Sequence, residues 1–568
     1  MLSKTSINSL ENRVLLISTL FFLFITSDLH PFIIPHAGHD EGLFFALARN
    51  IKLTGWLGKY NQLTLAKVPG YPIWLFLCNT FGLSEFRVKV FLYIFSSFFF
   101  SKVLSKFFCS RKKLSSSIIF ILLLFNPIIF TNVFYRTTRD GVYISLISLI
   151  VACLINMYVI NKKTSFIESF IFYFALFFSY LFREENVLIL FLLFIFQLSN
   201  LFLYYGKSFF KELKKSDILE LITKYSKPWL VLFLLISVIS GVNYFKYGYF
   251  GINSRNMTEY KKAVGAIYRA SYNQSERYLT VKQKDRELIY KNSPSFSLLK
   301  DVLDGTDARW KREIRNKNGK LVNDFGGWFE WAFKSAIQKK GLSSSLNSER
   351  EFLLKVSDEI NQSCDKGLIE TEIKQYRQVL PIYKNDYLCP LMSSILKGCH
   401  DLFLLDNISL YNQEYHFCDC DDSQWYVFSN FCNISPVPNR SIPNDHFSGL
   451  NIGSGISKMK LFLLEIVLFI YKLIVPFLCV CTLFSFLYLL IKYRSISKKI
   501  LVTFVCLLAF IFLRIIVLAY IDVTMYSAVN NLYFLPIYPL FLAVIFIVPF
   551  YLINLFYNGT INSNALPK

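Results

Sequence analysis

The sequence lacks several features that would place it in a common class of protein. No small-residue cleavage site follows the first apolar run, residues 14–34, so we expect a retained helix rather than a signal peptide. No internal repeat of the kind found in many secondary transporters is visible. Cys418 and Cys420 are separated by a single residue, whereas zinc sites use about two to four, so no metal site is predicted from them.

Acidic residues are also few, and the resulting charge needs an explanation. The chain has 61 Lys and Arg against 39 Asp and Glu, a formal net charge of +22. The basic residues cluster in short links between apolar runs, at residues 111–113, 162–163, 207–227 and 492–499. This is the pattern of positive residues retained on the cytoplasmic side of a membrane, so we predict no nucleic-acid partner.

Apolar residues are abundant. They make up 54% of the 568 residues, against about 45–50% in soluble domains. The mean hydropathy is +0.40. The aromatic residues, 18% of the chain, lie inside long runs such as 91–108 and 166–182, where a bilayer is a simpler explanation than base stacking.

These runs predict an α-helical polytopic membrane protein with about ten transmembrane helices. They cover residues 14–34, 87–108, 115–134, 140–160, 166–182, 186–205, 228–245, 461–491, 499–521 and 531–556.

Three modules follow from this division. Residues 1–245 hold about seven spans and a first outer loop at 35–86, and residues 457–568 hold about three spans. Between them, residues 246–456 predict an extracytoplasmic domain of mainly α or mixed structure, which is long enough to bury its own core.

Short amphipathic segments are expected in both outer regions. Residues 42–52 carry apolar side chains at helical spacing, and residues 73–81 are apolar but too short to span a membrane. In the large outer domain, residues 328–337 and 349–360 predict two further helices. We interpret the tryptophans near residue 328 as part of a small hydrophobic core.

Six cysteines fall in the outer domain, an even number that is compatible with three disulfides. The pairing cannot be deduced from the sequence, but disulfides would place this domain in an oxidising compartment. The candidates are Cys364, Cys389, Cys399, Cys418, Cys420 and Cys432.

Alternating the spans across the membrane places a set of charged residues on one outer face, where no cytoplasmic retention of positive charge operates. Each of them has a simple interpretation as an interfacial anchor or a structural ion pair, for example between the neighbours Arg139 and Asp140 or the neighbours Arg183 and Glu184. His36 and His39 precede this set and are interpreted as polar loop residues rather than ligands. The set consists of Asp40, Glu41, Lys67, Arg136, Arg139, Asp140, Arg183, Glu184 and Glu185.

Acids and cations together at a membrane surface suit the transfer of a group from a lipid-linked phosphate. Arg or Lys holds the phosphate and stabilises the charge that develops as it leaves. A carboxylate takes the proton of the acceptor hydroxyl, and an inverting sugar transfer needs both kinds of group.

A family resemblance adds to this pattern. Asp40-Glu41 after the first span, then Lys67-x-Pro69-x-Tyr71-Pro72, resembles the opening of GT-C membrane glycosyltransferases, with the closest likeness to the protein mannosyltransferase and aminoarabinose transferase group, family 39. Residues 135–140 (Tyr-Arg-Thr-Thr-Arg-Asp) and 533–539 (Tyr-Phe-Leu-Pro-Ile-Tyr-Pro) are similar too. The likeness covers mainly residues 14–205 and 499–556.

The resemblance implies a polyprenyl-phosphate sugar donor and an acceptor that is a lipid, a glycan or a protein. It implies Asp40 as the catalytic base, with Glu41 assisting by orientation or by a metal contact, so a divalent metal ion stays open. The candidate donor phosphate-binding residues are Lys67, Arg136 and Arg139, which the resemblance implies, and Arg183, which is added from the charged set. The supporting residues are Asp140, Glu184, Glu185 and Tyr533.

The chain departs from the family where Asn530-Asn531-Leu532 stands before Tyr533, since related sequences often have Arg there. Two other functions compete with the transferase. An O-antigen polymerase or ligase would concentrate its functional residues in the large outer domain. A lipid-linked sugar transporter would use charges within the spans, of which Arg514 is the clearest. For the transferase we expect the bacterial inner membrane, with the large domain in the periplasm.

Overall fold

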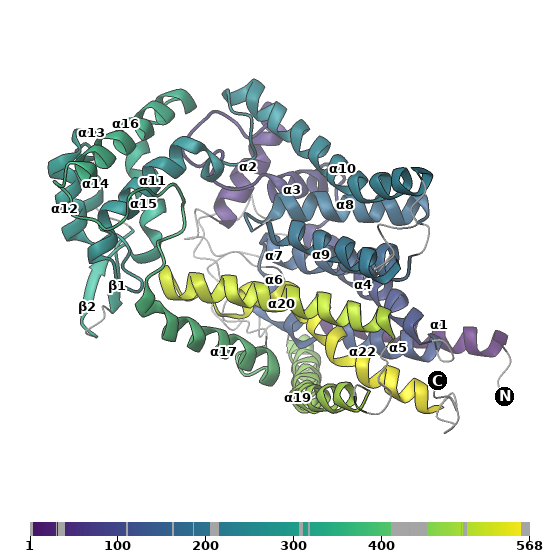
Figure 1. Ribbon diagram of the computed structural model, residues 1–568. Helices are drawn as coiled ribbons and strands as arrows, with labels where there is room; N and C mark the ends of the chain where they lie inside the picture. The colour runs from purple at the N-terminus through teal and green to yellow at the C-terminus, as the bar shows by residue number, and fades with distance from the viewer. Residues whose placement is uncertain are drawn as a thin grey trace.

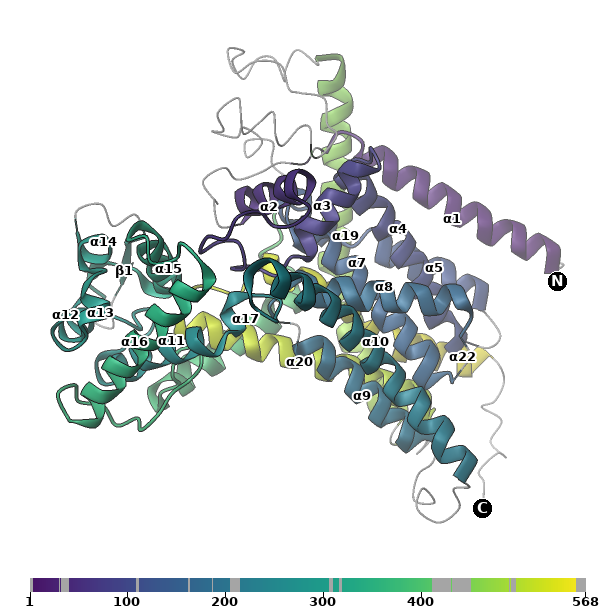
Figure 2. The ribbon, with the colours of Figure 1, turned by 90° about the horizontal axis from the view of Figure 1, so that it is seen from above.

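The structure is a computed structural model. It describes residues 4–29, 31, 40–108, 112–161, 164–185, 187–204, 215–305, 310–315, 319–410, 431, 451–489, 491 and 497–557. His36 and His39, together with Cys418, Cys420 and Cys432, lie outside these ranges. The chain is 76% helical, which confirms the predicted helical character. Figures 1 and 2 show a bundle of long helices with a smaller group of helices to one side.

The first part of the bundle runs from α1 to α10. Its helices are α1 (Lys4–Thr26), α2 (Glu41–Thr54), α3 (Gly70–Thr80), α4 (Glu85–Leu104), α5 (Lys112–Leu124), α6 (Asn132–Tyr135), α7 (Arg139–Leu154), α8 (Phe166–Phe182), α9 (Val187–Tyr204) and α10 (Lys215–Tyr247). Short η segments extend three of them: η1 (Ser105–Phe107), η2 (Pro127–Phe130) and the π-helical η3 (Ile155–Val159). After the outer domain the bundle continues with α19 (Asn451–Tyr488), α20 (Lys498–Thr524), α21 (Asn531–Phe534), η12 (Leu535–Ile537) and α22 (Tyr538–Tyr557).

Within the described residues, six helices are long and apolar enough to cross a membrane. They are Glu85–Phe107, Arg139–Val159, Leu221–Tyr247, Lys458–Tyr488, Lys498–Thr524 and Asn531–Phe556. Three shorter apolar helices accompany them, at Leu114–Phe130, Phe166–Phe182 and Val187–Leu203. Every predicted apolar run contains a helix, but the predicted total of about ten spans stays a prediction.

The bundle has a centre and a periphery. The span that contains α7 is 94% buried and packs between α4 and α8, whereas the span within α19 is only 17% buried. The outward face of α19 carries Phe469 and Phe477, which are 62% and 66% exposed. A helix with large apolar side chains on its outside is solvated by lipid more readily than by water, so α19 fits the edge of a membrane bundle.

Residues 246–456, predicted to be extracytoplasmic and called the outer domain below, are mainly helical where the structure describes them. Its elements are η5 (Ser254–Asn256), α11 (Thr258–Ser271), η6 (Tyr272–Gln274), α12 (Gln283–Asn292), α13 (Pro294–Ser297), α14 (Lys300–Asp304), β1 (Arg312–Arg315), β2 (Leu321–Asp324), η7 (Gly326–Trp328), α15 (Phe329–Lys339), α16 (Leu346–Asp365) and η8 (Asn385–Tyr387). The two strands form an antiparallel hairpin in which Arg312 is opposite Asp324. The core lies between α11, α15 and α16, and it includes Tyr260, Phe329 and Phe333.

The helix that follows η8 does not belong to that core. Helix α17 (Leu388–Leu404) packs along α20, and its Ile395 and Leu402 join the hydrophobic core of the bundle. Ser394 on the same helix donates a 2.6 Å hydrogen bond to Asp522 of α20. In Figure 1, α17 runs beside α20 along the lower side of the bundle. Helix α17 therefore connects the outer domain to the membrane helices.

The outer domain and the bundle also meet directly at the C-terminal end of α20. A Cβ atom on Gly327 of η7 would lie 2.6 Å from the carbonyl oxygen of Met525, immediately after α20. Only glycine permits so close an approach of two backbones. The outer domain is thus held against the loop that joins α20 to α21.

Candidate functional site

The outer charges predicted from the sequence form one connected cluster. It is built from the start of α2, the Lys67 turn, the α6–α7 connection and the α8–α9 connection, with α20 and α21 behind it. These are helix ends that are far apart in the sequence, and tight packing of α7 against α4 and α8 brings them together. The structure thereby assembles all the predicted catalytic, phosphate-binding and supporting residues in one place.

Asp40 is the most solvent-accessible carboxylate of the cluster. Its side chain is 33% exposed and lies 3.2 Å from the Nζ atom of Lys67. Asp40 is the N-cap residue of α2, but its carboxylate makes no capping hydrogen bond to the helix. Its two oxygens are therefore not committed to stabilising the helix start, which is the usual structural role of an aspartate in that position.

Glu41 occupies a different environment from its neighbour. Its side chain is 1% exposed, and the guanidinium group of Arg136 binds both of its oxygens, through Nε and through Nη2 at 2.8 Å. Burial alone would lower the pKa of Arg136, but the hydrogen bonds and charge of Glu41 raise it above its ordinary value. This geometry is that of a buried ion pair which fixes the start of α2 against the α6–α7 connection.

A second buried pair, which the sequence analysis missed, supports the first. Glu85 and Lys89 on α4 are both fully buried, with 3.7 Å between their charged atoms. Lys89 donates a 3.4 Å hydrogen bond to the carbonyl oxygen of Arg136, and Tyr71 donates one of 3.3 Å to Glu85. The sequence signal that was overlooked is an acid and a lysine four residues apart on an apolar helix.

The next two ion pairs join the start of α7 to the α8–α9 connection. Arg139 binds Glu184 at 2.9 and 3.0 Å and donates to the carbonyl oxygen of Phe182 at 2.8 Å. Arg183 in turn pairs with Asp140. The neighbours Arg139–Asp140 and Arg183–Glu184, considered as pairs from the sequence, have thus exchanged partners. The exchange ties the start of α7 to the end of α8.

These contacts set the charge state of the α8–α9 connection. Burial alone would raise the pKa of Glu184, but Arg139 and Lys67 hold it well below its ordinary value. The pKa of Glu185 is also below its ordinary value, because Arg514 and Arg183 outweigh the effect of burial. Both glutamates are therefore ionised at neutral pH.

Arg183 and Arg514 form the most deeply buried part of the cluster. Their side chains are 4% and 1% exposed, and Glu185 lies between them, 3.8 Å from Arg183 and 2.8 Å from Arg514. Burial, with some help from neighbouring arginines, lowers the pKa of Arg183 to about 10. Within the described part of the chain, Nε of Arg183 and Nη2 of Arg514 are buried without a hydrogen-bond partner.

Tyr533 lies beside these two arginines. Its ring centroid is 5.4 Å from the guanidinium group of Arg183, and its carbonyl oxygen accepts a 3.0 Å hydrogen bond from Nε of Arg514. Arg514 was noted in the sequence as a charge within a span, but its place in this cluster was not predicted. A lone arginine in an apolar helix requires an acidic or polar partner. This requirement is the overlooked signal that Arg514 belongs to a charged cluster.

The outer domain contributes groups that the sequence analysis did not assign to the site. The Nζ atom of Lys67 lies 5.1 Å from the ring centroid of Trp331 on α15. Arg255 of η5 is close enough to Glu184 to interact with it electrostatically, and it pairs with Glu330 at 3.0 Å. The outer domain therefore covers the Asp40–Lys67 side of the cluster.

The interpretation of the tryptophans as a small hydrophobic core is wrong. Trp328 and Trp331 lie outside the core of the outer domain, and Trp310 packs at its edge. All three rings are partly exposed. Phe325, Phe329 and Phe333 fill the core instead, because consecutive helical turns of α15 and η7 point these phenylalanines inward.

No protein-family model, curated protein or solved structure matches this chain. The resemblance to GT-C glycosyltransferases stays a prediction, and function has to be inferred from the chemistry of the site itself.

No metal centre is evident in the part of the chain that the structure describes. Among those residues, no group of three or more His, Cys, Asp and Glu side chains is arranged to hold a metal ion. The question of a divalent ion stays open. Cys364, Cys389 and Cys399 are free cysteines, and the other three disulfide candidates lie outside the described residues, so disulfide pairing also stays a prediction.

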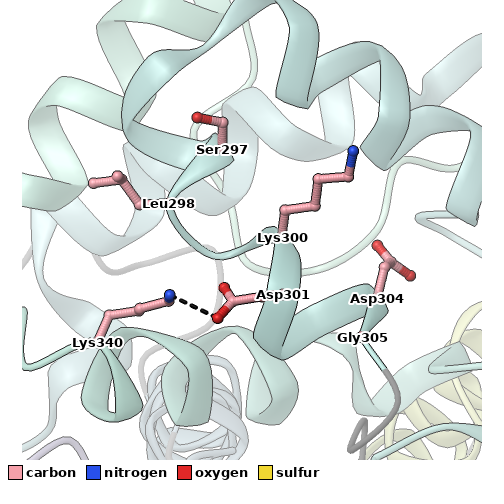
Figure 3. Close-up of a pocket in the computed structure, with 7 residues that line it drawn as sticks. All are labelled: Ser297, Leu298, Lys300, Asp301, Asp304, Gly305 and Lys340. Atoms are coloured by element: carbon pink, nitrogen blue, oxygen red, sulfur yellow. Dashed lines mark hydrogen bonds and ion pairs between the residues drawn. The ribbon is translucent and has the colours of Figure 1, made fainter.

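A surface pocket of the outer domain lies away from this cluster. It is lined by α13, α14 and the end of α15, where Lys340 and Asp301 form a 2.7 Å ion pair (Figure 3). In Figures 1 and 2, α13 and α14 lie on the side of the outer domain that faces away from the bundle. This ion pair is partly exposed, so it contributes little to the stability of the fold. We assign no function to this pocket.

Proposed function

We propose that this protein is a membrane glycosyltransferase that moves a sugar from a polyprenyl-phosphate donor to an acceptor on the outer face of the membrane. The observation that carries the proposal is the difference in exposure and partner between Asp40 and the other carboxylates of the charged cluster. Asp40 is partly exposed and faces a lysine, whereas Glu41 and Asp140 are buried against arginines. A carboxylate that stays accessible among buried ion pairs is suited to exchange a proton with a substrate.

Asp40 takes the role of general base. Lys67, 3.2 Å away, holds the Asp40 carboxylate in place, and a carboxylate oxygen can accept the proton of a hydroxyl group that is brought within hydrogen-bond distance. In the reaction the acceptor hydroxyl oxygen attacks the anomeric carbon while its proton passes to Asp40. The bond from that carbon to the donor phosphate oxygen breaks, and its electron pair leaves with the phosphate.

The phosphate role fits Arg183 and Arg514 better than Arg136 and Arg139. The guanidinium groups of Arg136 and Arg139 are each bound on two nitrogens by one glutamate, so they have less to offer a ligand. Arg183 and Arg514 each keep a buried N–H group without a partner among the described residues. A buried unpaired donor costs about 1–3 kcal/mol, and a phosphate oxygen that accepts from it would remove that cost.

The test of the base compares two aspartates in similar settings. Asp28 is 35% exposed and lies 2.7 Å from Lys460, so it matches Asp40 in exposure and in having a lysine partner. The arginines of the charged cluster pair with other acids and not with Asp28. Asp40→Asn should lower transfer by about 10²- to 10⁴-fold, and Asp28→Asn should leave it unchanged. Mass spectrometry of envelope glycans and lipid-linked sugars measures the product. Full transfer by Asp40→Asn at normal expression would refute the proposal.

The test of the phosphate site replaces arginine by lysine. This substitution keeps the positive charge but removes the planar guanidinium group, which can donate two parallel hydrogen bonds to a phosphate. Arg183→Lys and Arg514→Lys should each lower kcat/KM for the donor roughly 10- to 100-fold, because each loses charge-assisted hydrogen bonds of about 1.5–3 kcal/mol. Undecaprenyl phosphate, used as a probe, should raise the melting temperature of the wild type and not that of either variant. Arg350→Lys, which changes a partly exposed pair with Glu259, is the control. Equal protection of all variants by the probe would contradict the assignment.

One observation bears on each alternative. Arg514, on which the transporter hypothesis depended, pairs with Glu185 of the outer loop cluster. The polymerase or ligase hypothesis gains from Trp331, since it brings the large outer domain to Lys67. Replacement of the outer domain would abolish all chemistry in a ligase. Movement of a lipid-linked sugar across liposomes without a change of linkage would favour the transporter.

A further inference from the structure

Helix α17 divides into three faces, and the first of them packs against the bundle. This face contacts α20, beside which α17 runs in Figure 1. A helix turns by about 100° per residue, so the buried side chains of α17 fall within an arc of about 120°. They are Ser394, Ile395, Gly398, Asp401 and Leu402. The remaining two thirds of the circumference of the helix lies outside this contact.

The second face of α17 is apolar and exposed. Leu388 and Met392 are 56% and 49% exposed. Leu396 and Phe403 are 65% and 36% exposed. These four side chains, which we call the apolar stripe, fall within an arc of about 80° directly beside the buried face. Apolar surface left in water costs about 25 cal/mol per Å², so a continuous row of large apolar side chains indicates an apolar environment.

The third face of α17 is mainly polar. Ser393, Lys397 and His400 are exposed and fall within an arc of about 60° on the other side of the apolar stripe. Leu404, the last residue of the helix, lies on the same arc but is less exposed. Separation of the exposed residues into an apolar and a polar arc indicates that the two arcs meet different solvents. A helix at a membrane surface has this pattern, with one face towards acyl chains and another towards water.

The position of α17 along α20 agrees with a membrane surface. Ser394 of α17 contacts Asp522, and a Cβ atom on Gly398 would lie 3.1 Å from Cγ2 of Ile515. The candidate span Lys498–Thr524 has 27 residues. Its length of about 40 Å exceeds the hydrocarbon thickness of about 30 Å. The end of α20 that α17 contacts therefore lies at the boundary between acyl chains and head groups.

The apolar surface continues from α20 towards α17. Leu508 and Phe512 of α20 are 39% and 50% exposed, as expected for side chains that face lipid. They lie about 50° around α20 from the row of Ile515 and Asp522, which α17 contacts. The lipid-facing side of α20 and its contact with α17 are thus neighbouring faces of the same helix.

Tyrosines mark the same end of α20. Tyr383, which precedes α17, is 37% exposed, and its ring stacks on that of Tyr520 with 6.5 Å between the centroids. Tyrosine is enriched at membrane–water interfaces because its ring is apolar and its hydroxyl group is polar. This pair supports the same level for the membrane surface, independently of the pattern on α17.

We propose that α17 is a membrane-surface helix whose apolar stripe inserts among the acyl chains of a phospholipid bilayer, while Lys397 and His400 face the head groups and water. Because α17 joins the outer domain to the membrane helices, this contact anchors the outer domain to the bilayer. The inference does not depend on the transferase reaction, since no residue of the charged cluster takes part in it.

Spin labels on the full-length protein in phosphatidylcholine–phosphatidylglycerol vesicles measure the solvent of each face. Leu396→p-acetylphenylalanine and Lys397→p-acetylphenylalanine, each coupled to a nitroxide, place the label on the apolar stripe and on the polar face. Oxygen concentrates among acyl chains, whereas a hydrophilic nickel complex stays in water. The ratio of oxygen to nickel collisions should be several-fold higher at residue 396 than at residue 397. Leu298→p-acetylphenylalanine, at a side chain that is 53% exposed in the outer domain, is the aqueous control and should resemble residue 397.

Two results of this measurement would overturn the inference. One is an equal ratio of collisions at residues 396, 397 and 298, which would place the apolar stripe in water. The other is infrequent collision with both reagents at residue 396, which would show that a protein chain covers it, such as a second copy of this chain. If the label at residue 396 impairs folding, Met392→p-acetylphenylalanine gives the same measurement one helical turn away.

Photocrosslinking identifies the molecule that touches the apolar stripe. Leu396→p-benzoylphenylalanine is irradiated in membranes of cells that make the protein, and the intact protein is analysed by mass spectrometry. A phospholipid adduct is expected, and Lys397→p-benzoylphenylalanine should give several-fold less of it. A polypeptide adduct at residue 396, or no lipid adduct there, would contradict the inference.

Discussion

The sharpest test of the division of labour in the cluster is the substitution Glu41→Gln. Glutamine has nearly the same size as glutamate, so it leaves no cavity. It removes the negative charge and replaces one of the two acceptor oxygens that Arg136 contacts with a donor group. Because Glu41 is 1% and Arg136 17% exposed, breaking this pair from one side should destabilise the protein by about 3–5 kcal/mol.

The measurement is the thermal unfolding of the purified protein in detergent, for each single variant and for the double variant Glu41→Gln/Arg136→Met. If the two side chains are a structural pair, the double variant should be more stable than the sum of the single effects predicts, by about 0.5–3 kcal/mol. Glu259→Gln is the control, since Glu259 pairs with Arg350 at the surface and the two side chains are 14% and 37% exposed. Its loss should cost about 0–1 kcal/mol.

One result would refute this reasoning. If Glu41→Gln unfolds at the temperature of the wild type but has lost transfer activity, Glu41 takes part in the chemistry, as the sequence analysis expected. The ion pair with Arg136 would then be a minor contribution to stability. A loss of both properties in parallel is the outcome that the buried geometry predicts.

Two further predictions concern the outer domain. Gly327→Ala should separate Trp328 from the α20–α21 loop, because its Cβ atom would meet the Met525 carbonyl oxygen, and it should reduce transfer while the protein still folds; Gly241→Ala, with open space around it, should do neither. Burial raises the pKa of Asp285 to about 7, so between the ordinary aspartate pKa and that value the folded state binds more protons than the unfolded state, and stability falls as pH rises. Asp285→Asn should abolish that fall, measured as melting temperature at pH 5 and pH 8.

Much of the fold could be predicted from the sequence because its signals are local. The helix expected at residues 42–52 is α2 (Glu41–Thr54), and the segments near 328–337 and 349–360 are α15 and α16. Apolar spacing reports directly on which face of a helix is buried. The hairpin of β1 and β2 was not predicted, because four-residue strands with mixed side chains carry almost no periodic signal.

The site could be predicted in part. Counting spans and basic links predicted a shared face for Asp40, Arg139 and Glu184, and the structure brings these three residues close to one another. The partners could not be predicted, because an arginine and an acid that are adjacent in sequence at a helix end point in different directions. Arg139 reaches Glu184, which is 45 residues away, because α7 and α8 pack side by side.

The balance of charge in the cluster links its geometry to the proposed reaction. Among the described residues the cluster contains five cations and five acids, so its formal charge is zero. When Asp40 accepts the proton of the acceptor hydroxyl, the protein side of the site gains one positive charge. In the same step the phosphate gains one negative charge as the sugar leaves. The added positive charge of the protein would then stabilise the negative charge on the leaving phosphate in the same step. Such stabilisation is strong because the site is buried and its charged groups are already in position. The ten residues are Lys67, Arg136, Arg139, Arg183 and Arg514, with Asp40, Glu41, Asp140, Glu184 and Glu185.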